Sequence, residues 1–78
     1  MDEILIKSDG LMGWCVESDN NCYIENLAYY LKRRKDFKCN VDFVDYGLSV
    51  CSAWSTQKVL RGIVDFTLKC CLDFEVEF

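Results

Sequence analysis

Three carboxylates near the C-terminus have a regular spacing that could serve in binding or in acid–base catalysis. Asp73, Glu75 and Glu77 alternate with apolar residues through the segment 72–78, a period that predicts a strand with one apolar and one acidic face. Carboxylates two residues apart on a strand lie about 6.6–6.8 Å from one another. Phosphates along one nucleic-acid strand advance about 3.4 Å each, and winding makes their through-space separation roughly twice that. The row can therefore imitate a phosphate backbone.

A fourth carboxylate, Asp42, joins this row if the strand predicted over 37–44 lies beside the C-terminal strand. A simpler interpretation also accounts for the row. Polar residues belong on a solvated strand face, and charges on a terminal strand discourage edge-to-edge aggregation. The row is also expected on an open face rather than in a pocket, which disfavours general acid–base catalysis.

The segment Lys32–Lys38 carries the opposite charge. It holds five cations and Asp36, a net charge of +4, so the rest of this chain of net charge −4 carries −8. Tyr29 lies one helical turn before Arg33, and aromatic rings beside cations can stack on nucleic-acid bases. The alternative interpretation is that these cations complement the C-terminal end of a helix dipole and aid solubility. Because the whole chain is acidic, direct binding of nucleic acid is disfavoured.

No catalytic constellation accompanies these charges. The 78 residues include no histidine, which removes the commonest general base and the commonest metal ligand. The serines therefore have no imidazole to activate them, and the sequence holds no glycine-rich phosphate loop. Among the cysteines only Cys22 lies near an expected helix N-terminus, where a thiol can become reactive. We expect a protein that is not an enzyme and has no cofactor.

The six cysteines form no C-x-x-C motif, and their closest spacings are Cys15 to Cys22 and the vicinal pair Cys70–Cys71. Vicinal residues on a helix point about 100° apart and do not easily share one metal ion. The N-terminus is acidic, unlike a secretory leader, and no apolar run reaches the length of a membrane span. We expect reduced structural thiols in a cytoplasmic protein without membrane association. Disulfides or a metal site are the alternatives.

The elements that must position these residues follow from turns and apolar periodicity. Asp9–Gly10 predicts a hairpin turn between two strands, and Asp45–Gly47 predicts a second one. Apolar residues at i, i+3, i+4 and i+7 predict two amphipathic helices. The predicted order is strand 2–8, strand 11–17, helix 20–35, strand 37–44, strand 48–54, helix 56–70 and strand 72–78.

This order predicts one α+β domain over residues 1–78. We expect an antiparallel or mixed sheet of about five strands, with two helices on one face and solvent on the other. Ile63 is placed at the centre of the second helix's apolar arc, and Gly62 on the rim of its polar arc. The alternation buries all five phenylalanines, whereas the aromatic side chains without a clear position are Tyr29, Tyr46 and one of Trp14 and Trp54.

In size and charge the chain resembles small phage-encoded anti-CRISPR proteins. The resemblance rests on the 78-residue length, on the segment 73–77 and on the lack of a catalytic set. Such proteins are single compact domains, often acidic, that bind and block a nuclease complex. Immunity proteins, antitoxins and viral accessory proteins share these properties.

The resemblance implies a viral, non-enzymatic inhibitor or adaptor that works by protein–protein contact in the host cytoplasm. Its acidic face would block a basic nucleic-acid channel of the partner. The expected partner-binding residues are Asp42, Asp73, Glu75, Glu77, Tyr29 and Arg33. The alternative is a small module that binds nucleic acid or another anion through Lys32–Lys38, and a third hypothesis is a thiol-based redox or metal-binding domain.

Overall fold

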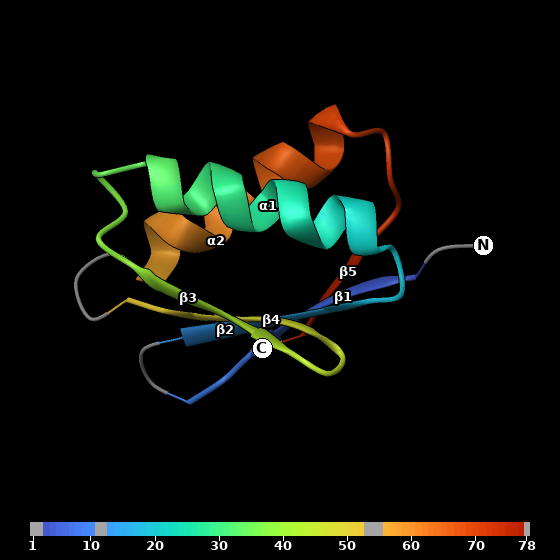
Figure 1. Ribbon diagram of the computed structural model, residues 1–78, viewed down its shortest axis with the longest axis horizontal. Coiled ribbons are helices and arrows are strands. Elements are labelled where there is room, and N and C mark those ends of the chain that lie inside the picture. The colour runs from blue at the N-terminus through green and yellow to red at the C-terminus, as the bar shows by residue number, and fades with distance from the viewer. Residues whose placement is uncertain (1–2, 11–12, 53–55, 78) are drawn as a thin grey trace.

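Two helices lie on one face of a five-stranded sheet in the computed structural model, which describes residues 3–10, 13–52 and 56–77 (Figure 1). The predicted α+β class and element order are confirmed. The elements are β1 (Ile4–Ser8), β2 (Gly13–Ser18), α1 (Asn21–Arg33), β3 (Asn40–Val44), β4 (Gly47–Cys51), α2 (Thr56–Lys69) and β5 (Glu75–Glu77).

The sheet is mixed, with strand order β3-β4-β2-β1-β5. Neighbouring strands are antiparallel except β1 and β5, which are parallel. A parallel partner needs a crossover, and α2 is the helix that carries the chain back over the sheet before β5. The strands β3 and β5 are therefore the two opposite edges of the sheet.

The pairing register divides the strand residues between the two faces. The sheet face beneath the helices carries the fully buried side chains of Ile6, Val16 and Leu48, which lie in one row across β1, β2 and β4. Paired residues point to the same side of a sheet. The intervening residues, among them Lys7 and Glu17, therefore lie on the opposite face, which neither helix covers (Figure 1).

Helix α1 begins at a side-chain cap and packs against α2 through aromatic rings. The Asn20 side chain accepts a hydrogen bond of 3.0 Å from the backbone N–H of Tyr23, which satisfies one free donor of the first turn. The Tyr23 hydroxyl and Thr67 Oγ1 are 2.6 Å apart in the buried helix interface. Burial raises the pKa of Tyr23 to about 12. The ring of Phe66 contacts both Tyr23 and Tyr30.

Gly62 is buried, so its predicted place on the rim of the polar arc is wrong. A Cβ atom at this position would lie 2.5 Å from Cζ of Phe37. Phe37 is 2% exposed and belongs to the segment between α1 and β3 rather than to a strand. The missing side chain on α2 thus makes room for the Phe37 ring, which offsets the low helix propensity of glycine.

The predicted burial of Phe43 is also wrong, because this side chain is 56% exposed. Phe43 shares a sheet face with Leu48, its cross-strand partner, so its direction agrees with the predicted alternation. It stands on the edge strand β3, however, where only one neighbouring strand can cover it. Phe66 and Phe74 are partly buried against the core. Phe78 and Trp54 lie outside the described residues.

The segment after α2 explains why the last strand is shorter than predicted. Helix α2 ends in a turn in which Cys71 N–H donates to Leu68 O at 3.0 Å and Leu72 N–H donates to Thr67 O at 3.4 Å. Cys71 has a φ of 58° there, the left-handed conformation that usually selects glycine at this position. The predicted strand over 72–78 is reduced to β5, Glu75–Glu77, because the chain needs residues 70–74 to descend to the sheet.

Replacing Cys71 by glycine is expected to stabilise the protein. Cys71→Gly removes the steric cost of a side chain in the left-handed region, about 1 kcal/mol. For a domain of this size, that gain corresponds to a rise in melting temperature of about 4–8 °C. Thermal unfolding followed by circular dichroism measures it. Cys70→Gly is the matched control, since Cys70 has no positive φ, and it should not raise the melting temperature. A lower melting temperature for Cys71→Gly would contradict the strain assigned to this turn.

Candidate functional site

The charges of the protein are divided between its two layers. The helical ranges 21–38 and 56–69, which include the segment after α1, hold eight of the nine Lys and Arg residues and three of the thirteen Asp and Glu residues. Their net charge is +5. The strands and remaining connections hold Lys7 and ten acidic residues, a net charge of −9. The charge imbalance along the chain therefore separates basic helical ranges from acidic strands and connections.

Three carboxylates gather around one lysine on the uncovered face of the sheet. The register pairs Leu5 with both Glu17 and Glu75, and Lys7 with Glu77. These side chains therefore point to the same face, which we call the acidic face: Leu5, Lys7, Glu17, Glu75 and Glu77. Glu75 and Glu77 are exposed, as the alternation predicts. They are about 6.6 Å apart along the strand by strand geometry.

Among the strand residues that the structure describes, Lys7 is the only cation, and it is held within the acidic face. Its Nζ atom lies 3.1 Å from Oε2 of Glu17. The hydrogen bond to Glu17 raises the pKa of Lys7, and the charge of Glu77 raises it further. Lys7 therefore neutralises one carboxylate and leaves Glu75 and Glu77 as surplus negative charge at the β5 edge.

Sequence reasoning missed Glu17 as a member of this face. The residue belongs to β2, two strands away from β5, and only the strand order brings it near Glu75. Cys15 and Glu17 alternate with Trp14 and Val16 along the chain, and this alternation indicates the sheet face to which the Glu17 side chain points. No local signal gives the order of strands, so its neighbours could not be predicted.

Two of the predicted acidic residues, Asp42 and Asp73, are not aligned with Glu75 and Glu77 on β5. Asp42 points to the same side of the sheet as Glu77, since Asp42, Ser49, Cys15, Lys7 and Glu77 form one row across the five strands. The condition for Asp42 to join the row, that its strand lies beside the last strand, is not met. The two stand on opposite edges, four strand spacings or about 19 Å apart. Asp73 is exposed but precedes β5, so the pleat of the strand does not align it with Glu75.

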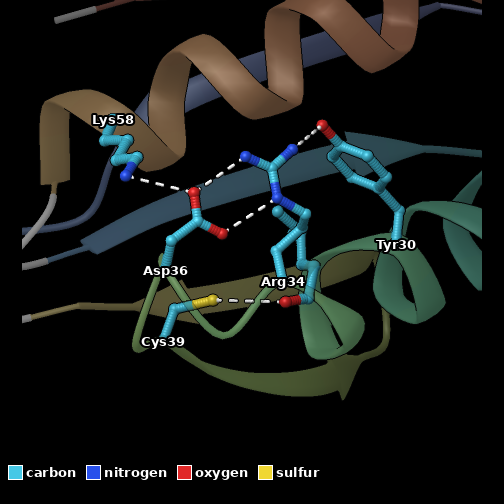
Figure 2. A network of polar contacts seen from close by, with 6 residues as sticks. Tyr30, Arg34, Asp36, Cys39 and Lys58 are labelled. Atoms are coloured by element: carbon cyan, nitrogen blue, oxygen red, sulfur yellow. Dashed lines mark hydrogen bonds and ion pairs between the residues drawn. The ribbon is translucent and has the colours of Figure 1, made fainter.

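One cation of the basic segment, Arg34, is held by contacts within the protein (Figure 2). Arg34 donates to both carboxylate oxygens of Asp36, at 2.9 and 2.8 Å, and to the Tyr30 hydroxyl at 2.8 Å. Lys58 on α2 lies 3.1 Å from the same carboxylate. The hydrogen bonds from Arg34 and Lys58 lower the pKa of Asp36. The Arg34 guanidinium also lies 4.4 Å from the centre of the Phe37 ring. Arg34 therefore joins α1 to the following segment, and Asp36 links both to Lys58 on α2.

Two further cations of α1 stack on exposed aromatic rings. Arg33 lies 5.2 Å from the ring centre of Tyr29, and Lys32 lies 5.5 Å from that of Phe43. Tyr29 is 64% exposed. We call these four residues the α1–β3 patch. The predicted partner-binding residues Tyr29 and Arg33 thus lie together, but on helix α1 and not on the sheet face that carries Glu75 and Glu77. The predicted set is split between two surfaces.

The thiols and carboxylates of the described residues do not form a group that could hold a metal ion. All six cysteines are free. Burial raises the pKa of the Cys15 thiol. Within residues 3–10, 13–52 and 56–77, no three Cys, Asp or Glu side chains are grouped as a metal ion would require.

The chain was compared with protein-family models, with curated protein sequences and with solved structures. None of them matches. Of the helices that the structure describes, neither α1 nor α2 has the length and apolar character to cross a membrane. The function is therefore inferred from the charges and contacts of the two surfaces.

Proposed function

We propose that this protein is a non-enzymatic inhibitor or adaptor that binds a basic surface of a partner protein through its acidic face. The observation that carries the proposal is the division of charge between the layers, with a net charge of −9 outside the helical ranges. An uncovered sheet face with surplus carboxylates attracts a basic partner over long distances and accelerates association. The exposed side chains of Glu75 and Glu77 are the central contacts.

The spacing of the carboxylates supports a particular kind of target. Glu75 and Glu77 repeat at about the through-space distance between neighbouring phosphates of one nucleic-acid strand. A channel that binds nucleic acid through Lys and Arg side chains would accept such a pair in place of phosphates. This property agrees with an anti-CRISPR-type role, in which the protein occupies the nucleic-acid channel of an RNA-guided nuclease.

Charge reversal on β5 tests the proposal. We expect Glu75→Lys/Glu77→Lys to fold like the wild type, because both side chains are exposed and face away from the helices. The probe is a panel of RNA-guided nucleases, each loaded with guide RNA and titrated with the protein before fluorescent target DNA is added. The wild type should slow DNA binding by one of them, and the double variant should lose at least about tenfold in inhibitory potency.

A control variant with the same change in net charge distinguishes an effect of the acidic face from an effect of the net charge of the whole protein. Glu25→Lys/Asp65→Lys also changes the charge by +4, but both residues are exposed on the helices. It should keep most of the inhibition. Equal losses in the two variants would assign the effect to net charge alone. Absence of inhibition across the panel would contradict the nuclease as target, and retained inhibition by the folded β5 variant would contradict the acidic face.

A further inference from the structure

The outer edge of β3 is a second surface with features of a binding site. Strand β3 ends the sheet, so alternate residues of Asn40–Val44 turn their main-chain N–H and C=O groups outward. Exposed edges of this kind can accept an extended segment as a further strand. Phe43 stands on this edge and is 56% exposed, and exposed aromatic side chains are frequent anchors of protein interfaces.

Helix α1 runs beside β3 in the opposite direction. The Cys39 thiol lies 4.0 Å from the carbonyl oxygen of Leu31, so the end of the helix lies beside the start of the strand. At the other end, a shallow pocket separates the first turns of α1 from the end of β3. Its lining comes from both elements, from β2 and from the β3–β4 hairpin: Ser18, Asn21, Ile24, Glu25, Phe43, Val44, Asp45 and Gly47.

Charges of both signs lie along this edge. Lys32, on the last turn of α1, lies over the Phe43 ring, with its Nζ atom 5.5 Å from the ring centre. Glu25 and Asp45 line the pocket at the end beside Val44. An added strand would therefore meet one cation, Lys32, beside the Phe43 ring and the carboxylates of Glu25 and Asp45 in the pocket that the same ring adjoins.

We propose that the β3 edge binds an extended segment of a partner protein as an additional antiparallel strand. Because an antiparallel segment begins where β3 ends, complementarity requires a basic side chain near its N-terminus and acidic side chains near its C-terminus. These side chains must lie on the face that points toward α1, with an apolar side chain between them to contact Phe43. Main-chain hydrogen bonds contribute affinity, and the charge order selects the segment.

The other sheet edge and other ligands fit these observations less well. Strand β5 has three residues, two of them exposed glutamates, which is the composition of a protected edge. Single-stranded nucleic acid could stack on Tyr29 and Phe43, but its phosphates would meet the carboxylates of Glu25 and Asp45 in the adjoining pocket. A polypeptide with both acidic and basic side chains can place a charge of opposite sign beside the cation and beside the carboxylates of this edge.

Two synthetic peptides of identical composition test the proposal. The first, acetyl-KTVTETE-amide, carries lysine, valine and two glutamates at alternate positions in the order proposed for an antiparallel strand. The second, acetyl-ETETVTK-amide, has the reverse order. Titration of isotope-labelled protein, followed by amide chemical shifts, should show the first peptide perturbing residues 40–44 and the end of α1. We expect it to bind about tenfold more tightly than the reversed peptide.

Two variants locate the contact. Phe43→Ala should weaken binding of the first peptide about tenfold, because the anchor is lost, while the fold is kept since the ring is largely exposed. Lys32→Glu/Arg33→Glu should reduce or reverse the preference between the peptides. The control Glu75→Lys/Glu77→Lys should bind the first peptide like the wild type, because it changes the acidic face and leaves the β3 edge intact. Peptide binding at β3 can therefore succeed or fail separately from the proposed function.

Several results would overturn the proposal. These are an absence of shifts at millimolar peptide, equal binding of both peptides, and tighter binding of the reversed peptide, which would indicate a parallel strand. Shifts of the same residues by a short oligothymidylate but not by the peptides would assign the edge to nucleic acid. Shifts that depend on protein concentration alone would assign it to a second copy of this chain.

Discussion

Ile63→Asp is expected to unfold the protein. Ile63 is fully buried on α2 and faces the sheet within the central apolar cluster. A carboxylate there has no partner, and burying it costs several kcal/mol. Small domains have a total stability of about 5–15 kcal/mol, so the loss removes much or all of it. Circular dichroism of the purified variant should show no cooperative thermal transition near that of the wild type.

The control for this variant is Arg61→Asp. Arg61 precedes Ile63 by two residues on the same helix but is exposed, so the same carboxylate remains in solvent there. The change should cost no more than about 0.5 kcal/mol. Similar melting temperatures for the two variants would mean that the face of α2 assigned to the core is wrong.

Gly47→Ala is expected to be nearly as damaging, although it adds a single methyl group. Gly47 opens β4 with a φ of 151°, and an added Cβ would overlap the carbonyl oxygen of Val16. The carbonyl belongs to the backbone of the neighbouring central strand and cannot move without breaking the β2–β4 pairing. We expect a loss of about 3 kcal/mol or more from clash and strain together, measured by urea denaturation.

Gly10→Ala provides the comparison for Gly47→Ala. Gly10 also has a positive φ, of 77°, but no atom lies within 4 Å of the position of an added Cβ. The only cost of Gly10→Ala is that alanine disfavours the left-handed backbone conformation, which lowers the free energy of unfolding by about 1 kcal/mol. If the two alanine variants were equally stable, the close approach of β4 to β2 at Gly47 would be contradicted.

Local patterns in the sequence predicted the elements, because each pattern reports on its own segment. The helical spacing of the apolar residues Ile24, Leu27 and Leu31 predicted α1, and these side chains are buried. The alternation in 72–78 predicted that Glu75 and Glu77 share a face, and the register confirms it. Even the direction of Phe43 was predicted correctly, while its burial was not.

The errors concern contacts between segments far apart in the chain. The burial of Phe43 depends on whether a strand lies on each side of β3, and the placement of Asp42 depends on which strand lies beside it. Gly62 was assigned from the helix alone, whereas its environment is set by Phe37 from another segment. Glu17 was missed for the same reason. The candidate surfaces are products of strand order, which no single segment encodes.

The parallel pairing of β5 with β1 also affects how the protein folds. It joins Leu5 to Glu75, residues that are distant in sequence, whereas the β1–β2 and β3–β4 hairpins join near neighbours. Closing such a long loop costs entropy before any contact compensates for it, and non-local pairings of this kind slow folding. The strand that carries Glu75 and Glu77 is therefore expected to dock late, after the hairpins have formed. Until it docks, the acidic face lacks these two carboxylates and β1 presents an open edge to other chains.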